Sequence, residues 1–192
     1  MDPEGSLTQL KQQLNEVTDL LHIRNVLSWD QQTHMPPGGT RDRGHHRATI
    51  SRLAHVKYTS DEIGALLEKL EPYAEEMDPD SDDARLVKVT ARQYEKRTKV
   101  PADLVAQTAR VTAEAHPIWQ EAKAESNFRK FQPYLENIVD LRRQYAQLFA
   151  PFDHIYDPLL DDYEPGMKTT EVQAIFSTLR PQQVELIQAI TA

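Results

Sequence analysis

The chain has 192 residues, of which 39% are hydrophobic and 27% charged, and its formal net charge is −8. This length is enough to bury the core of an ordinary domain, and the composition is typical of a folded globular chain rather than a disordered one. The acidic balance argues against a nucleic-acid partner bound through a broad basic face. The absence of cysteine excludes a disulfide scaffold, a thiolate zinc site and a cysteine nucleophile.

The first residues have neither the basic region nor the apolar region of a secretory signal. No apolar run approaches the roughly 20 residues that a membrane helix needs. The sequence therefore predicts a cytoplasmic protein with no membrane partner.

Apolar residues recur at helical spacing from the beginning of the chain. The first such stripe predicts a helix that ends near Trp29 and comprises Leu7, Leu10, Leu14, Val17 and Leu21. Prolines and glycines at 35–39 should break this helix, because proline lacks a backbone donor and glycine favours turns. A second helix is expected at about 40–56, and a third at about 61–74 with Ser60 as its N-cap.

The acidic stretch 78–83 has two interpretations. A calcium loop needs glycine at its sixth position and glutamate at its twelfth, where this chain has Asp83 and Val89. The stretch is therefore better explained as a loop leading into a helix N-terminus, where acidic side chains favour the helix dipole. That helix is expected to run to about Thr98.

The remaining helices are predicted from further stripes and from proline positions. Pro101 should open a helix that Pro117 kinks or ends early, and Pro151 should end the helix after that. A short segment at 155–163, a turn at 165–166 and a last helix capped by Thr169 or Thr170 complete the chain. No alternating strand pattern is present. The sequence thus predicts an all-α fold, a bundle or array of about seven or eight helices with no significant sheet.

Known catalytic motifs are missing from the chain. Among its seven histidines there is no His-Glu-x-x-His helix, and there is no serine-hydrolase or phosphate-loop motif. His45 and His46 are adjacent, so on a helix they point about 100° apart and cannot easily chelate one ion. They are expected to form an exposed basic patch with Arg41, Arg43 and Arg47 rather than a metal site.

Two segments, 28–39 and 156–167, mix aromatic, acidic and turn residues at helix ends. Such mixtures line ligand grooves, so the candidates for a substrate groove are Trp29, Asp30, Tyr163 and Glu164. The alternative is that Trp29 and Tyr163 are core aromatics whose polar tips bond to Asp30 or Asp162. The sequence leaves both interpretations open, and burial is the commoner fate of such rings.

The same two segments resemble motifs of the carboxypeptidase Taq family. Residues 28–39 are similar to its Trp-Asp-Gln-x-Thr-x-Met-Pro motif, and residues 156–167 to its Tyr-Asp-x-Leu-Leu-Asp-x-Tyr-Glu-Pro-Gly motif. Residues 89–101 and 133–143 also resemble the family. Gln32 departs from it, because the family often has glutamate at this position.

The resemblance implies a metal-dependent carboxypeptidase that removes single residues from peptide C-termini. Members of the family are mostly helical, cytoplasmic and homodimeric, with zinc or cobalt in a deep groove. Their metal ligands lie beyond the region matched here, so no catalytic or metal-binding residue can be transferred to this chain. Residues 1–192 are therefore expected to be the N-terminal helical region of a metallocarboxypeptidase, truncated before its catalytic region and inactive alone.

Two further expectations follow. The last helix carries an apolar face without a C-cap glycine after it, which favours self-association into a homo-oligomer. The rival to the scaffold interpretation is a non-catalytic helical interaction module that kept the family's sequence without its activity.

Overall fold

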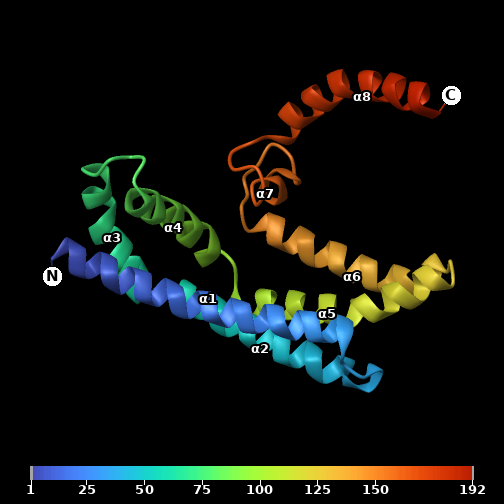
Figure 1. Ribbon diagram of the computed structural model, residues 1–192, viewed down its shortest axis with the longest axis horizontal. Coiled ribbons are helices and arrows are strands. Elements are labelled where there is room, and N and C mark those ends of the chain that lie inside the picture. The colour runs from blue at the N-terminus through green and yellow to red at the C-terminus, as the bar shows by residue number, and fades with distance from the viewer. Residues whose placement is uncertain (1, 192) are drawn as a thin grey trace. The chain divides into compact units, whose positions relative to one another are not determined.

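The computed structural model describes residues 2–191, and over that range its regular elements are all helices, as the periodicity predicted (Figure 1). Eight α-helices and one 3₁₀ turn follow each other in chain order. They are α1 (Pro3–Thr33), η1 (Pro37–Gly39), α2 (Thr40–Tyr58), α3 (Asp61–Glu75), α4 (Asp82–Thr98), α5 (Ala102–Ala124), α6 (Phe128–Gln147), α7 (Asp157–Leu160) and α8 (Thr169–Thr191). Within the described range, no helix is both long and apolar enough to cross a bilayer.

The chain divides into two compact units, Met1–Leu141 and Arg142–Ala192, and the boundary falls inside α6. In the first unit α2 packs against both α1 and α5, and α3 packs against both α1 and α4. Figure 1 shows α1 and α2 running alongside each other over much of their length. The long N-terminal helix therefore serves as the common support for its two neighbours.

The core of the first unit contains the residues that the first stripe predicted. Leu7 and Leu10 of α1 are buried against Ile63 and Leu70 of α3 and Val87 of α4. A second cluster, formed by Val17, Ala54 and Tyr58, joins α1 to α2. Burial of this apolar surface, rather than helix propensity, supplies most of the stability of such helices.

Helix starts agree well with the sequence signals. Ser60 caps α3 by accepting a hydrogen bond from the N–H of Ile63 at 3.4 Å, and Ser81 caps α4 by accepting from Ala84 at 3.3 Å. The acidic stretch 78–83 forms the loop and first turn of α4, as the dipole argument favoured.

One of the two outcomes expected at Pro117, an early end of the helix, is excluded. α5 does not end at Pro117 but continues to Ala124. A proline inside a helix removes one hydrogen bond, but Val111, Ala115 and Ala122 on the same helix are all buried. The packing of these buried side chains therefore stabilises the helix by more than the missing hydrogen bond at Pro117 costs.

Candidate functional site

The segment 28–39 forms the junction between α1 and α2. The carbonyl of Asp30 accepts the N–H groups of His34 and Met35, each at 2.9 Å, and so closes the last turn of α1. The carboxylate of Asp30 forms an ion pair with Arg43 of α2, with 2.6 Å between Oδ2 and Nη2. Asp30 thus fixes the junction through both its backbone and its side chain.

Hydrogen bonds extend this junction to a third helix. Arg43 also donates to the carbonyl of Leu27 at 2.6 Å, and its side chain is only 15% exposed. Arg47, one turn further along α2, donates to Oε1 of Gln31 at 3.0 Å. The amide of Gln31 in turn donates to the carbonyl of Ala113 in α5 at 2.9 Å. The network positions α1, α2 and α5 relative to one another.

The predicted exposed basic patch is only partly present. His45 and His46 are exposed, but Arg43 and Arg47 turn inward toward α1. Burial lowers the pKa of Arg47, and the nearby charges of Arg24 and Arg43 lower it further. The reason for the difference is their spacing of four residues, which places both arginines on the α2 face that packs on α1.

Trp29 is not a core aromatic. It is 59% exposed, and its ring lies 5.1 Å from the ring of His34, centroid to centroid, at a tilt of 48°. Asp30 lies beside it in the partly buried ion pair. The structure therefore presents an aromatic surface next to a fixed carboxylate at the end of α1.

The segment 156–167 in the second unit is organised by Asp157, which is buried. Its Oδ1 accepts from the N–H of Thr169 at 2.8 Å and from the Thr169 hydroxyl at 2.6 Å, and its Oδ2 accepts from the N–H of His154 at 3.2 Å. The bonds from Thr169, followed by those from His154 and the charge of Lys168, lower the pKa of Asp157 against the opposing effect of burial. Asp157 thus ties α7 to the beginning of α8.

Capping of α8 differs from the prediction. Thr169 is the first residue of the helix and donates to Asp157, while the N–H of Lys168 donates to Glu171 at 2.7 Å. Two carboxylates therefore accept the N–H groups at this helix start, and neither Thr169 nor Thr170 serves as the acceptor. Gly166 has a φ of +84°, which suits glycine in the turn expected at 165–166.

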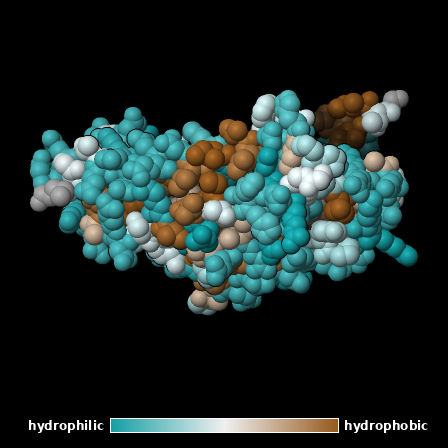
Figure 2. All heavy atoms as spheres, turned by 90° about the horizontal axis from the view of Figure 1, so that it is seen from below, coloured by the Kyte–Doolittle hydropathy of each residue, from teal (hydrophilic) through white to brown (hydrophobic). Residues whose placement is uncertain are grey.

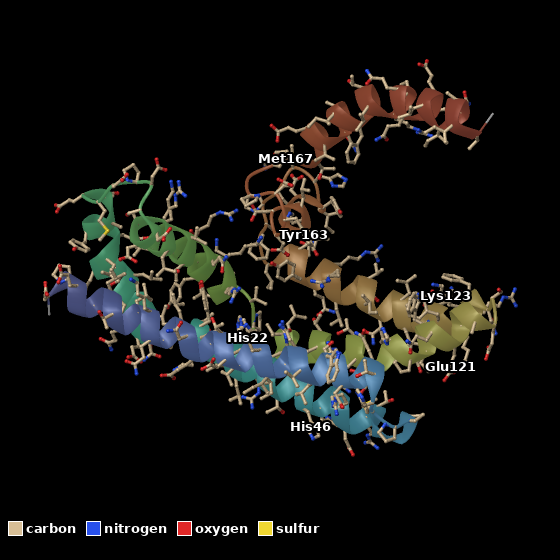
Figure 3. The ribbon with its side chains drawn as sticks, in the orientation of Figure 1. His22, His46, Glu121, Lys123, Tyr163 and Met167 are labelled. Atoms are coloured by element: carbon tan, nitrogen blue, oxygen red, sulfur yellow. The ribbon has the colours of Figure 1, made fainter. Side chains whose placement is uncertain are left out.

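Tyr163 is 83% exposed, and Glu164 beside it is also exposed. Figure 3 shows Tyr163 and Met167 in the connection between α7 and α8. The core interpretation expected the phenol of Tyr163 to bond to Asp162, but Asp162 accepts from the hydroxyl of Tyr145 at 2.9 Å. Burial raises the pKa of Tyr145, and the hydrogen bond to Asp162 raises it further. Tyr145 is thus the structural tyrosine here, and Tyr163 is free to meet solvent.

The four candidates belong to different units, Trp29 and Asp30 to the first and Tyr163 and Glu164 to the second. Each pair is exposed or partly exposed at a helix end within its own unit. Their shared role in lining one groove stays a prediction. The sequence analysis missed the ion pair of Arg43 with Asp30, the hydrogen bond from Arg47 to Gln31, and the burial of Asp157.

Among residues 2–191, no group of three or more histidine, aspartate or glutamate side chains is arranged to hold a metal ion. The labelled His22 and His46, for example, belong to different helices, α1 and α2 (Figure 3). The described residues therefore do not fit a metal centre, and no chemical step through a metal is assigned to them.

Comparison with known proteins identifies the class to which this helical chain belongs. The family model described as carboxypeptidase Taq (M32) metallopeptidase matches residues 9–192. The chain therefore belongs to the M32 family of metallopeptidases.

Individual relatives agree with this assignment. Thermostable carboxypeptidase 1 of Thermus thermophilus is 34% identical over 189 residues, which are 94% of this chain and 37% of that protein. The solved structure of Pyrococcus furiosus carboxypeptidase is similar with a TM-score of 0.73 and 28% identity, over 97% of this chain and 37% of that one. The BsuCP crystal structure has a TM-score of 0.89 at 24% identity, over 98% and 37%, and supports the fold alone. The chain thus spans little more than a third of the length of these relatives.

Proposed function

We propose that residues 1–192 act as the helical N-terminal scaffold, and as one wall of the substrate groove, of a metal-dependent carboxypeptidase. The enzyme would remove C-terminal residues from peptides, with zinc or cobalt held by ligands outside the residues described here. The observation that carries the proposal is the family match over residues 9–192, together with the coverage of 37% of the Thermus thermophilus relative.

The exposed aromatic and acidic residues support a place in the groove. Trp29 and Tyr163 are exposed by 59% and 83%, which is unusual for large aromatic side chains. Each lies next to a carboxylate, Asp30 or Glu164. Aromatic surfaces with a few fixed polar groups are typical of ligand sites. We therefore assign these four residues to substrate positioning and not to bond cleavage.

A complementation experiment tests the scaffold role. The Thermus thermophilus relative, expressed without the segment that corresponds to residues 1–192, is combined with this chain in the presence of zinc. We expect hydrolysis of an N-blocked dipeptide by the combination and none by either part alone. The relative's own N-terminal segment, supplied in the same way, is the positive control.

Two outcomes would contradict the proposal. Hydrolysis by the purified chain alone, with zinc or cobalt and free of contaminating peptidase, would show that its own residues suffice for catalysis. Stable association without any hydrolysis, when the positive control is active, would instead favour a non-catalytic interaction module.

A further inference from the structure

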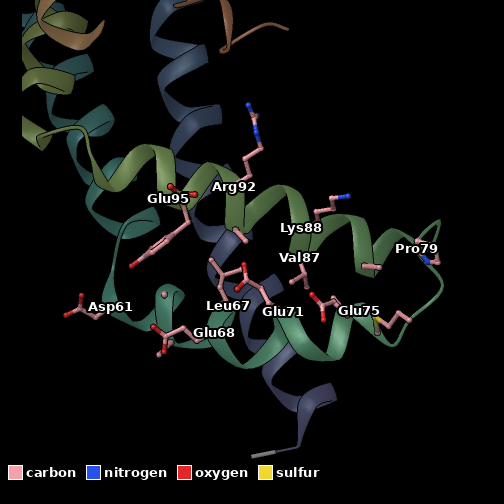
Figure 4. Close-up of a pocket in the computed structure, with 17 residues that line it drawn as sticks. Asp61, Leu67, Glu68, Glu71, Glu75, Pro79, Val87, Lys88, Arg92 and Glu95 are labelled. Atoms are coloured by element: carbon pink, nitrogen blue, oxygen red, sulfur yellow. The ribbon is translucent and has the colours of Figure 1, made fainter. Parts of the chain in front are cut away.

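A groove runs between α3 and α4 in the first unit, and none of its lining residues is among those assigned above to substrate positioning. It has a cavity volume of about 1030 Å³ and is lined by both helices and by the loop that joins them. The two helices pack directly on each other beneath it. Figure 4 shows this groove with the side chains that line it.

The floor of the groove is apolar. Leu67, Ala84 and Val87 are buried there, and Ala74 and Ala91 are partly buried. Alanines at these positions leave space that larger side chains would fill. The apolar surface left in water there is that of the partly buried alanines, and covering it with a partner side chain gains about 25 cal/mol for each Å².

One edge of the groove is acidic. Glu68, Glu71 and Glu75 line it from α3, at intervals of three and four residues that place them on one helix face. All three side chains are exposed. In Figure 4, Glu71 and Glu75 extend toward the space between the helices, whereas Lys88 and Arg92 project from the far side of α4.

The surrounding charge reinforces this acidic edge. Five acidic residues line the groove, Asp61, Glu68, Glu71, Glu75 and Glu95, but only two basic ones, Lys88 and Arg92. A partner that neutralises the edge must therefore be cationic, and it must also bring apolar side chains to the floor. These two requirements together describe an amphipathic basic segment.

We propose that the groove between α3 and α4 binds a cationic amphipathic helix of a partner protein. Glu68 and Glu75 are seven positions apart, which corresponds to about 10 Å along a helix axis. A helix laid along the groove presents cations at the same spacing, with leucine-sized side chains between them over the partly buried Ala74 and Ala91. A partner segment can also bind by pairing with an exposed strand edge, but the described residues of this chain form no strand.

The test uses the purified chain and a labelled synthetic helical peptide. The peptide has lysines at positions i, i+3 and i+7 and leucines on the adjoining face, and binding is followed by fluorescence anisotropy. We expect saturable binding that weakens as ionic strength rises from about 0.05 M to about 0.5 M. The triple variant Glu68→Gln/Glu71→Gln/Glu75→Gln should weaken binding by at least about tenfold.

Two further variants distinguish peptide binding at the groove from general electrostatic attraction to the acidic chain. Asp19→Asn/Asp103→Asn/Glu185→Gln removes the same charge from exposed positions elsewhere, and binding should stay within about twofold of the unmodified chain. Ala65→Trp places a large ring at the exposed edge of the groove and should block the peptide without touching the core.

Several results would overturn the proposal. Equal binding of a shuffled peptide with no amphipathic face, or equal weakening by the control triple variant, would reveal non-specific charge attraction. A peptide that stays non-helical when bound, by circular dichroism, would exclude a helical partner. If the Glu68/Glu71/Glu75 variant changes the oligomeric state without peptide, the groove is occupied by a second copy of the chain instead.

Discussion

The guanidinium of Arg43 lies 2.6 Å from the carboxylate of Asp30 and also donates a hydrogen bond to the carbonyl of Leu27. One side chain of α2 therefore holds both the acidic side chain and the backbone at the last turns of α1. Because the side chain of Arg43 is 15% exposed and that of Asp30 is 34% exposed, water screens this pair only partly.

Arg43→Met should lower the free energy of unfolding by about 1–2 kcal/mol, because it leaves the Leu27 carbonyl and a partly buried carboxylate without a donor. Asp30→Asn should cost less, since the amide still accepts a hydrogen bond. Urea denaturation followed by circular dichroism measures both. Arg41→Met, at an exposed position of the same helix, is the matched control. Equal stability of the Arg43 and Arg41 variants would contradict a structural role for the pair.

Substitutions at the substrate-groove candidates should distinguish a role in positioning the substrate from a role in stabilising the fold. In the complemented enzyme, Asp30→Asn and Tyr163→Phe should change kcat or KM more than they change Tm. Tyr163 is the sharper case, because an 83% exposed ring contributes little to packing. Steady-state kinetics and thermal melts of the same preparations provide the comparison. Lower stability with unchanged kinetics would assign these residues to the scaffold alone.

His55 should make the stability of the first unit depend on pH. Its Nε2 lies 2.7 Å from the carbonyl of Val100 and must donate to it, since a carbonyl can only accept. Burial lowers the pKa of His55, the bond to Val100 opposes this effect, and the charge of Arg97 lowers the pKa further. The neutral imidazole is therefore favoured in the folded chain.

The lowered pKa determines whether stability rises or falls with pH. Because the pKa of His55 is lower in the folded chain than its unfolded value of about 6.5, His55 contributes to the free energy of unfolding. This contribution is complete above pH ~6.5 and is lost as the pH falls through the folded pKa. NMR titration of the His55 ring in the native chain should give a lower midpoint than in the urea-unfolded chain. His55→Gln should remove this part of the pH dependence. A native midpoint at or above the unfolded one would contradict the prediction.

The sequence predicted the helices well because their signals are local. The stripe that begins at Leu7 and the cap at Ser60 depend on residues three or four positions apart, and both are confirmed. The sequence could not decide between a kink and an early helix end at Pro117, because the cost of the proline is local, whereas the burial of Val111 and Ala115 that offsets it is tertiary.

The site was less predictable for the same reason. The ion pair between Asp30 and Arg43 crosses the turn at η1, so no helical spacing indicates it. The three hydrogen bonds that Asp157 accepts depend on how α7 meets α8, and its burial could not be read from the sequence. The exposure of Trp29 and Tyr163 argues against a core position within this chain, but their role in a substrate groove stays a prediction.

Gly64 should be intolerant of alanine because of Tyr94. A Cβ at this position would lie 2.5 Å from Oη of Tyr94 and 3.0 Å from its Cζ, and the Tyr94 hydroxyl is held by the carbonyl of Ser60 at 3.2 Å. Alanine normally stabilises a helix interior by about 0.5–1 kcal/mol relative to glycine. Here overpacking, at about 1–3 kcal/mol, should exceed that gain.

Chemical denaturation of Gly64→Ala therefore should show a net loss of stability. Tyr94→Phe removes the closest atom, so the double variant should be less destabilised than the two single effects together predict. Simple additivity, or a stabilised Gly64→Ala, would show that Tyr94 moves aside at little cost.

The last prediction concerns α8, where every apolar residue on one face is left accessible. No residue of this helix is buried, and its exposed hydrophobic residues are Ile175, Phe176, Leu179, Val184, Leu186, Ile187 and Ile190. Figure 2 shows hydrophobic residues of this helix at the surface, near the right-hand end of the view. Covering such a face is favourable by about 25 cal/mol for each Å² removed from water.

We expect purified chains to self-associate through this face, because a two-fold contact uses the same patch twice and is the simplest way to cover it. Light scattering over a concentration series should show a mass above that of one chain. Phe176→Lys/Ile187→Lys should return the chain to a monomer, since lysine on the contact face must bury a charge. The control Gln173→Lys/Gln188→Lys adds the same charge to α8 at exposed positions away from the centre of its apolar face, without removing any hydrophobic side chain. A chain that stays monomeric at high concentration and binds no hydrophobic dye would show that α8 folds back and covers its own apolar face.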